Sequence, residues 1–134
     1  RQRQMCIRDS GLPAANLEKN DVVYGAGLGS LEIARDAGVT MGFGTDLIGE
    51  TQPMQNRELV IRADVLSPGE ILSSMWTTNA ELCGLAGRVG VLEPGAFGDV
   101  VVSRVDPFES LSEFADPDRS FSHVVQHGRV VVER

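Results

Sequence analysis

The residues with the clearest chemical potential lie in one short run, Gly42-Phe43-Gly44-Thr45-Asp46. An apolar stretch ends there in a carboxylate, as a strand does where a parallel α/β barrel opens its active face. A carboxylate in that place can bind a metal ion or accept a proton from a water molecule. The alternative reading is structural, with Asp46 capping a turn or the segment that follows it.

Four polar residues follow this carboxylate closely: Glu50, Gln52, Asn56 and Arg57. A loop beyond the end of a strand is where binding residues concentrate, and Arg57 could pair with a carboxylate. The alternative for each of them is a role as a solvent-exposed polar residue at the start of a helix, without function in binding. We take Glu50, Gln52 and Arg57 as candidate substrate contacts.

The remaining metal-binding residue types are few and scattered. His123 and His127 lie in a valine-rich terminal segment in which His127-Gly128 is typical of a hairpin turn, so neither is expected to bind a metal. Cys6 and Cys83 are far apart and belong to no Cys-x-x-Cys pair, which argues against a disulfide framework and a structural zinc site. A reducing compartment, the cytoplasm, fits this cysteine usage best.

The elements around Asp46 are expected to alternate between strand and helix. An apolar run at Asp21–Tyr24 could form a strand, and Ser30 could cap a short helix that stops at Gly38. Val39–Phe43 then has the composition of a strand that delivers Asp46.

Helical signals continue after Asp46. Pro53 suits the first turn of a helix that carries Leu59–Ile61. Ser67-Pro68-x-Glu70 has the pattern of a capping box and opens a second helix, with a further helical turn at about residues 79–85. Ile71, Leu72, Met75 and Trp76 would form the buried face of the second helix.

Beyond Gly87 the pattern changes to β-branched runs. Punctuation by Pro94-Gly95, Asp106-Pro107 and His127-Gly128 divides these runs into short strands. The runs are Val89, Val91, Val100–Val102 and Val124–Val132. A small sheet is expected to follow the helices.

Charge and length exclude several classes of protein. The 134 residues include 12 Lys and Arg against 19 Asp and Glu, a net charge of -7. This acidic balance, spread along the chain, does not suit nucleic acid or anionic lipid. The longest apolar runs are strand-sized and far below the roughly 18 residues that a membrane span needs. Residues 1–10 are basic and lack the apolar core of a secretory signal, and we expect them to be a non-native tail.

A dinucleotide-binding domain is the rival interpretation. Val22-Val23-Tyr24 leads into Gly25-x-Gly27-x-Gly29, and an acidic residue, Asp46, follows about twenty residues later. Against this reading, Ser30 stands where the third glycine is expected, and no further βαβ unit follows. NAD binding by an oxidoreductase would be the expected activity in that case.

Three motifs in order, from about Leu28 to the C-terminus, resemble the end of an enzyme of the amidohydrolase superfamily. They are Ala34-Arg35-Asp36-Ala37-Gly38-Val39 with Gly44-Thr45-Asp46, then Ser67-Pro68-x-Glu70-Ile71-Leu72 with Thr77-Thr78-Asn79-Ala80-Glu81-Leu82 and Gly84-Leu85, and then Gly90-Val91-Leu92-Glu93-Pro94-Gly95 with Gly98-Asp99-Val100-Val101-Val102. Within that superfamily, the Thr45-Asp46 loop and the helix expected after it most resemble the imidazolonepropionase and Xaa-Pro dipeptidase branch.

The resemblance implies an α/β fold: the C-terminal end of a TIM-type (β/α)8 barrel at residues 11–86, then part of a small β-sandwich at residues 87–134. It implies a hydrolase of carbon–nitrogen bonds in cyclic amides, amides or dipeptides, with a metal-activated water. Asp46 matches the aspartate of the last barrel strand, a metal ligand that also accepts the proton of the water.

The metal would be divalent, Zn²⁺ by expectation, and the other ligands would lie upstream of this chain, which alone should be inactive. The expected partner is a small-molecule substrate, with neither nucleic acid nor membrane, and a homo-oligomer is compatible with the family. A non-catalytic remnant of the barrel is the third alternative.

Overall fold

The structure is a computed structural model that describes residues 14–134, with side chains described from Gly25 onward. The chain divides after Val39 into two units. The expected non-native tail, residues 1–10, lies outside the described residues.

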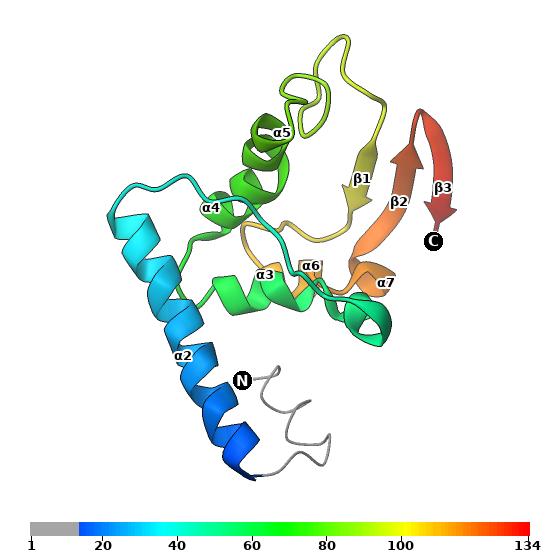
Figure 1. Cartoon of the computed structure of the whole chain (residues 1–134). Coiled ribbons are helices and arrows are strands. Elements are labelled where there is room, and N and C mark those ends of the chain that lie inside the picture. The colour runs from blue at the N-terminus through cyan, green and yellow to red at the C-terminus, as the bar shows by residue number, and fades with distance from the viewer. Residues whose placement is uncertain (1–13) are drawn as a thin grey trace. The chain divides into compact units, whose positions relative to one another are not determined.

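The first unit contains one long helix, α2 (Ala14–Asp36) (Figure 1). The strand expected at Asp21–Tyr24 is wrong, because these residues lie inside α2. Ser30 is likewise not an N-cap but an interior residue, and its hydroxyl donates to the carbonyl of Gly27 at 2.7 Å. A lone strand would leave its backbone groups unpaired, whereas a helix bonds its own, which outweighs the low helix propensity of the glycines.

The end of α2 agrees with its sequence. Gly38 has a φ of 66°, the left-handed conformation that favours glycine. The amide of Gly38 donates to the carbonyl of Arg35 at 2.9 Å, and that of Val39 donates to Ala34 at 2.9 Å. This pair of bonds is the Schellman motif, so the helix stop predicted at Gly38 is confirmed.

The second unit begins with an extended segment, residues 40–48, that belongs to no sheet. The strand expected at Val39–Phe43 is therefore wrong as a sheet element. A parallel strand needs neighbours that supply donors and acceptors, and the described residues provide no strand beside it. Side chains from later helices take that role instead.

Two short helices follow the extended segment. The first is η1 (Gly49–Met54), a 3-10 helix that contains Pro53, and the second is α3 (Arg57–Arg62). The single helix expected to start at Pro53 is thus two. Leu59 in α3 is 4% exposed, as expected of a core residue.

The capping-box prediction is confirmed at α4 (Pro68–Ser73). The Ser67 hydroxyl accepts from the Glu70 amide, and the Glu70 carboxylate accepts from the Ser67 amide at 2.8 Å. A π-helical turn, η2 (Ser74–Thr78), joins α4 to α5 (Asn79–Leu82). Ile71 and Leu72 are buried, but Trp76, expected in the core, is 42% exposed.

The C-terminal residues form a three-stranded antiparallel sheet in the order β1 (Val100–Ser103), β2 (Phe121–Gln126) and β3 (Arg129–Glu133) (Figure 1). The hairpin turn predicted at His127-Gly128 is confirmed, and both residues have positive φ, 50° and 73°.

The β-branched runs at Val89 and Val91 do not form strands, since Gly87 and Gly90, both with a φ of 74°, turn the chain there. The described residues contain this one sheet, so the second sheet of a sandwich is not among them.

Two short helices that the sequence did not predict lie between β1 and β2. They are α6 (Leu111–Phe114), capped by the Ser110 hydroxyl, and α7 (Pro117–Ser120), with proline in its first turn. Leu111 and Phe114 of α6 complete the core of the second unit. That core is Leu59, Leu66, Ile71, Leu72, Leu111 and Phe114, with Met41, Phe43, Val65, Met75, Ala115 and Phe121 packed against it.

In the described part of the chain, no helix has both the length and the apolar character to cross a membrane.

Candidate active site

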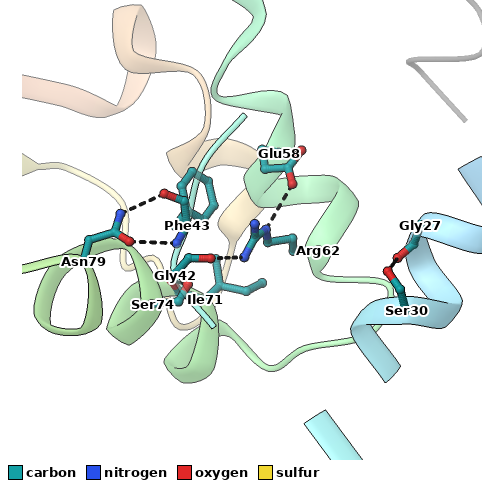
Figure 2. Close-up of polar contacts among 9 residues, drawn as sticks. All are labelled: Gly27, Ser30, Gly42, Phe43, Glu58, Arg62, Ile71, Ser74 and Asn79. Atoms are coloured by element: carbon teal, nitrogen blue, oxygen red, sulfur yellow. Dashed lines mark hydrogen bonds and ion pairs between the residues drawn. The ribbon is translucent and has the colours of Figure 1, made fainter. Parts of the chain in front are cut away.

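The segment that precedes Asp46 is held by the side-chain amide of Asn79, the first residue of α5. The Phe43 amide donates to Asn79 Oδ1 at 2.9 Å, and Asn79 Nδ2 donates to the Phe43 carbonyl at 2.8 Å. Figure 2 shows the two bonds side by side between the helix and the extended segment. One side chain thus satisfies both backbone polar groups of Phe43.

Arg62, from α3, holds the same segment one residue earlier. Its Nη1 donates to the Gly42 carbonyl at 3.0 Å, and its guanidinium lies 4.8 Å from the centre of the Phe43 ring. Its Nε forms an ion pair with Glu58 Oε1 at 3.0 Å, and the two side chains are only 8% and 13% exposed (Figure 2). The charge of Arg62 is therefore compensated in a largely buried place.

Gly42 is required by the close approach of α5. A Cβ at this position would lie 2.7 Å from Asn79 Oδ1 and 2.8 Å from Leu82 Cδ1. Met41 and Phe43, on either side, pack against the core. The alternation of an extended chain thus places two side chains in the core and leaves the glycine facing α5.

Asp46 stands exposed at the end of this segment in an uncommon conformation. Its φ is 49°, in the left-handed region that aspartate visits more readily than most residues. Within the described residues its carboxylate has no hydrogen-bond or ion-pair partner. The N-cap residue of η1 is Ile48, and it forms no side-chain hydrogen bond. Asp46 therefore does not cap the helix that follows it, which was its alternative role.

The candidate substrate contacts lie just beyond Asp46. Glu50 and Gln52 are exposed on η1, whereas Arg57 is half-buried at the start of α3 and engaged with another residue. Asn56, half-buried between the two helices, lines an apolar hollow. The structure therefore places Glu50 and Gln52 in the segment that follows Asp46, open to solvent.

The described residues do not complete a metal site. No group of three or more His, Cys, Asp or Glu side chains gathers within them. His123 Nε2 lies 3.7 Å from Glu133 Oε1 across the β2–β3 pair, with no third ligand. Asp46 offers a carboxylate oxygen of suitable chemistry for a divalent ion, but three or four ligands are needed for a catalytic zinc.

A hollow of about 720 Å³ in the second unit does not have Asp46 in its lining. Its lining is mostly apolar and comes from the helices and the sheet, including Leu59, Met75, Phe121, Val124 and Val125. Its one carboxylate, Asp99, accepts from the His127 amide at 2.7 Å. The candidate proton-transfer residue, Asp46, is therefore not part of this hollow.

Sequence reasoning missed the residues that hold this turn. Glu58 was not singled out from the sequence, yet its side chain is only 13% exposed and is paired with Arg62. The signal was present, because Glu58 and Arg62 are four residues apart on a helix, the spacing of an ion pair. Asn79 stood in a recognised motif, but no local pattern indicates that its amide reaches Phe43.

The dinucleotide-binding alternative fails on backbone grounds. It requires a strand, a glycine loop and then a helix, whereas Val22-Val23-Tyr24 and the glycines after them are one continuous helix.

The sequence model of the amidohydrolase family matches residues 6–131. An amidohydrolase of known crystal structure is 40% identical with a TM-score of 0.84, over 95% of this chain and 31% of that protein. A prolidase crystallised with N-methylphosphonate-L-proline is 38% identical with a TM-score of 0.83, over the same shares of the two chains.

A candidate prolidase from Bifidobacterium longum is 27% identical with a TM-score of 0.79, over 92% of this chain and 30% of that protein. None of the curated proteins compared matches the chain. The chain spans less than a third of the length of each of these solved proteins. A family match over nearly all of its residues, with an amidohydrolase and a prolidase as structural neighbours, shows that the chain belongs to the amidohydrolase family, in its Xaa-Pro dipeptidase-like branch.

Proposed function

We propose that the chain is the C-terminal part of a metal-dependent hydrolase that cleaves carbon–nitrogen bonds in small amides or dipeptides. In this proposal residues 11–86 end a (β/α)8 barrel and residues 87–134 contribute strands to a β-sandwich. Family membership and prolidase neighbours at 38% and 27% identity support the reaction class.

The observation that carries the proposal is the state of Asp46. Its carboxylate is exposed and has no partner among the described residues, and its backbone is held in the left-handed region at φ 49°. Such a conformation costs about 1–3 kcal/mol for a non-glycine residue and collects at functional sites. A residue that only ended a turn would be expected to bond its side chain locally.

In the proposed reaction Asp46 moves a proton. Its carboxylate takes the proton of the attacking water and passes it to the leaving nitrogen of the scissile bond. A bound divalent ion, Zn²⁺ in this proposal, supplies Lewis-acid activation, and Asp46 would be one of its oxygen ligands. The remaining ligands would come from sequence beyond the described residues, because these hold no group of three suitable side chains.

The substrate is proposed to be an Xaa-Pro dipeptide or a related small amide. Glu50, Gln52 and Arg57 would contact it, since they follow Asp46 along the chain and Glu50 and Gln52 are exposed. A small-molecule substrate also fits a chain with net charge -7, which does not favour nucleic acid or anionic lipid. A homo-oligomeric enzyme in the cytoplasm remains part of the same proposal.

Hydrolysis assays on the complete enzyme test this function. The enzyme is offered Xaa-Pro dipeptides, other dipeptides and cyclic amides, before and after removal of metal by a chelator and again after zinc is restored. We expect hydrolysis of at least one class of amide, its loss with the chelator and its return with zinc. Metal-replete enzyme that cleaves none of them would instead support a non-catalytic remnant of the barrel family.

A further inference from the structure

We propose that Asn79 is a positioning residue for the Asp46 carboxylate, a role that rests on the catalytic function proposed for Asp46. The Phe43 amide donates to Asn79 Oδ1 at 2.9 Å, and Asn79 Nδ2 donates to the Phe43 carbonyl at 2.8 Å. Only Gly44 and Thr45 separate Phe43 from Asp46. The extended segment is thus fixed at a point close to the reacting group.

A primary amide is well suited to this task. It carries a donor and an acceptor on one planar group, the same pair that a neighbouring strand would present to Phe43. Among the described residues no strand lies beside the segment, so the Asn79–Phe43 pair replaces that contact locally. An aliphatic side chain of similar size would leave both backbone groups of Phe43 unpaired in a partly buried place.

Two local features bring Asn79 to Phe43. The π-helical turn Ser74–Thr78 comes directly before Asn79, and such turns shift the face that later residues present and occur often at functional sites. Gly42 provides the space, since a Cβ there would lie 2.7 Å from Asn79 Oδ1.

The pair restrains Asp46 because the turn is strained. A φ of 49° persists only when the surrounding structure fixes it. Arg62 fixes the Gly42 carbonyl at 3.0 Å, and Asn79 fixes both polar groups of the next residue. Without Asn79 the turn can relax and move the carboxylate, and a displacement of about 1 Å costs roughly a hundredfold in rate.

Kinetics of the complete enzyme test the role. Asn79→Ala removes both bonds, Asn79→Asp keeps the size but sets a second acceptor against the Phe43 carbonyl, and Gly42→Ala crowds the amide from the other side. We expect each to lower kcat about tenfold to a hundredfold with KM and metal content little changed. Thr77→Ala, which removes one hydroxyl bond in the same helical run, should retain wild-type kcat.

Amide hydrogen exchange in the same enzyme gives a readout that does not depend on hydrolysis. Asn79→Ala and Gly42→Ala should expose the Phe43 amide to faster exchange, whereas Gly44→Ala, whose added Cβ meets nothing within 4 Å, and Thr77→Ala should not.

The outcomes separate the two claims. Unchanged exchange at Phe43 in Asn79→Ala overturns the Asn79–Phe43 pair, and faster exchange with wild-type kcat overturns the positioning role. A wild-type enzyme that hydrolyses no amide overturns the proposed function and the positioning role with it, and the exchange result still decides whether Asn79 holds Phe43.

Discussion

The ion pair between Glu58 and Arg62 should be among the most costly interactions of the second unit to break. Its side chains are 8% and 13% exposed, and Arg62 also donates to Gly42 and lies over the Phe43 ring. We consider Glu58→Met, Arg62→Met and the double substitution. Methionine keeps the apolar stem of either side chain and removes only the charged end.

The magnitude follows from burial. Breaking a buried ion pair by removing one partner lowers the free energy of unfolding by about 3–5 kcal/mol. Because the pair is slightly exposed, we expect Glu58→Met to lower it by about 3 kcal/mol. Arg62→Met also removes a bond to a carbonyl and a cation–π contact, so we expect about 4–5 kcal/mol. The double substitution removes both charges of this ion pair and should cost about 2–3 kcal/mol less than the two single effects together.

Urea unfolding of the 134-residue chain, followed by the fluorescence of Trp76, measures these differences. With a slope of about 2 kcal/mol per molar urea, Glu58→Met should lower the midpoint by about 1.5 M. Asp118→Asn is the control, because Asp118 pairs with Arg134 but is 81% exposed, and it should change stability by less than about 0.5 kcal/mol. Additive single effects, or a midpoint for Glu58→Met equal to that of the control, would refute the reasoning.

Two further predictions concern the helices and the metal. Ser67→Ala removes the capping box of α4 and should lower the free energy of unfolding by about 1 kcal/mol in the same urea assay. Ser73→Ala, which changes an exposed residue within α4, is the control and should lower it far less. Equal costs would show that the cap contributes nothing. Titration with zinc and a competing chelator should show no one-to-one complex with this chain alone. A catalytic zinc needs three or four ligands, and the described residues bring no such group together. Tight stoichiometric binding would contradict the proposal that the other ligands lie upstream.

The sequence predicted best where the cause of structure is local. The capping box at Ser67, the helix stop at Gly38 and the turn at His127-Gly128 each depend on a few adjacent residues, and all three were confirmed. The valine runs of β1, β2 and β3 were also identified correctly, since alternating β-branched residues pair within one small sheet.

Prediction failed where structure depends on distant partners. Residues 39–43 have the composition of a strand, but a strand forms only with neighbours, and the described residues give this segment Asn79 and Arg62 instead. Asp21–Tyr24 is helical because no strand is present to pair with it among the described residues, whereas a helix bonds its own backbone. At the site, the sequence singled out Asp46 but not the residues that hold its segment, because contacts across 20 and 36 positions leave no periodic signal.

The role of Asp46 is tested most directly by the turnover of Asp46→Asn in the complete enzyme. Asparagine matches aspartate in size and tolerates the left-handed φ of 49°, so folding should be preserved, but its amide cannot accept the proton of the attacking water. We predict that kcat falls by about a hundredfold or more with KM little changed. Asp99→Asn, in the segment before β1, should leave kcat near wild type. If Asp46→Asn kept most of its kcat with normal metal content, the proton-transfer role of Asp46 would be contradicted.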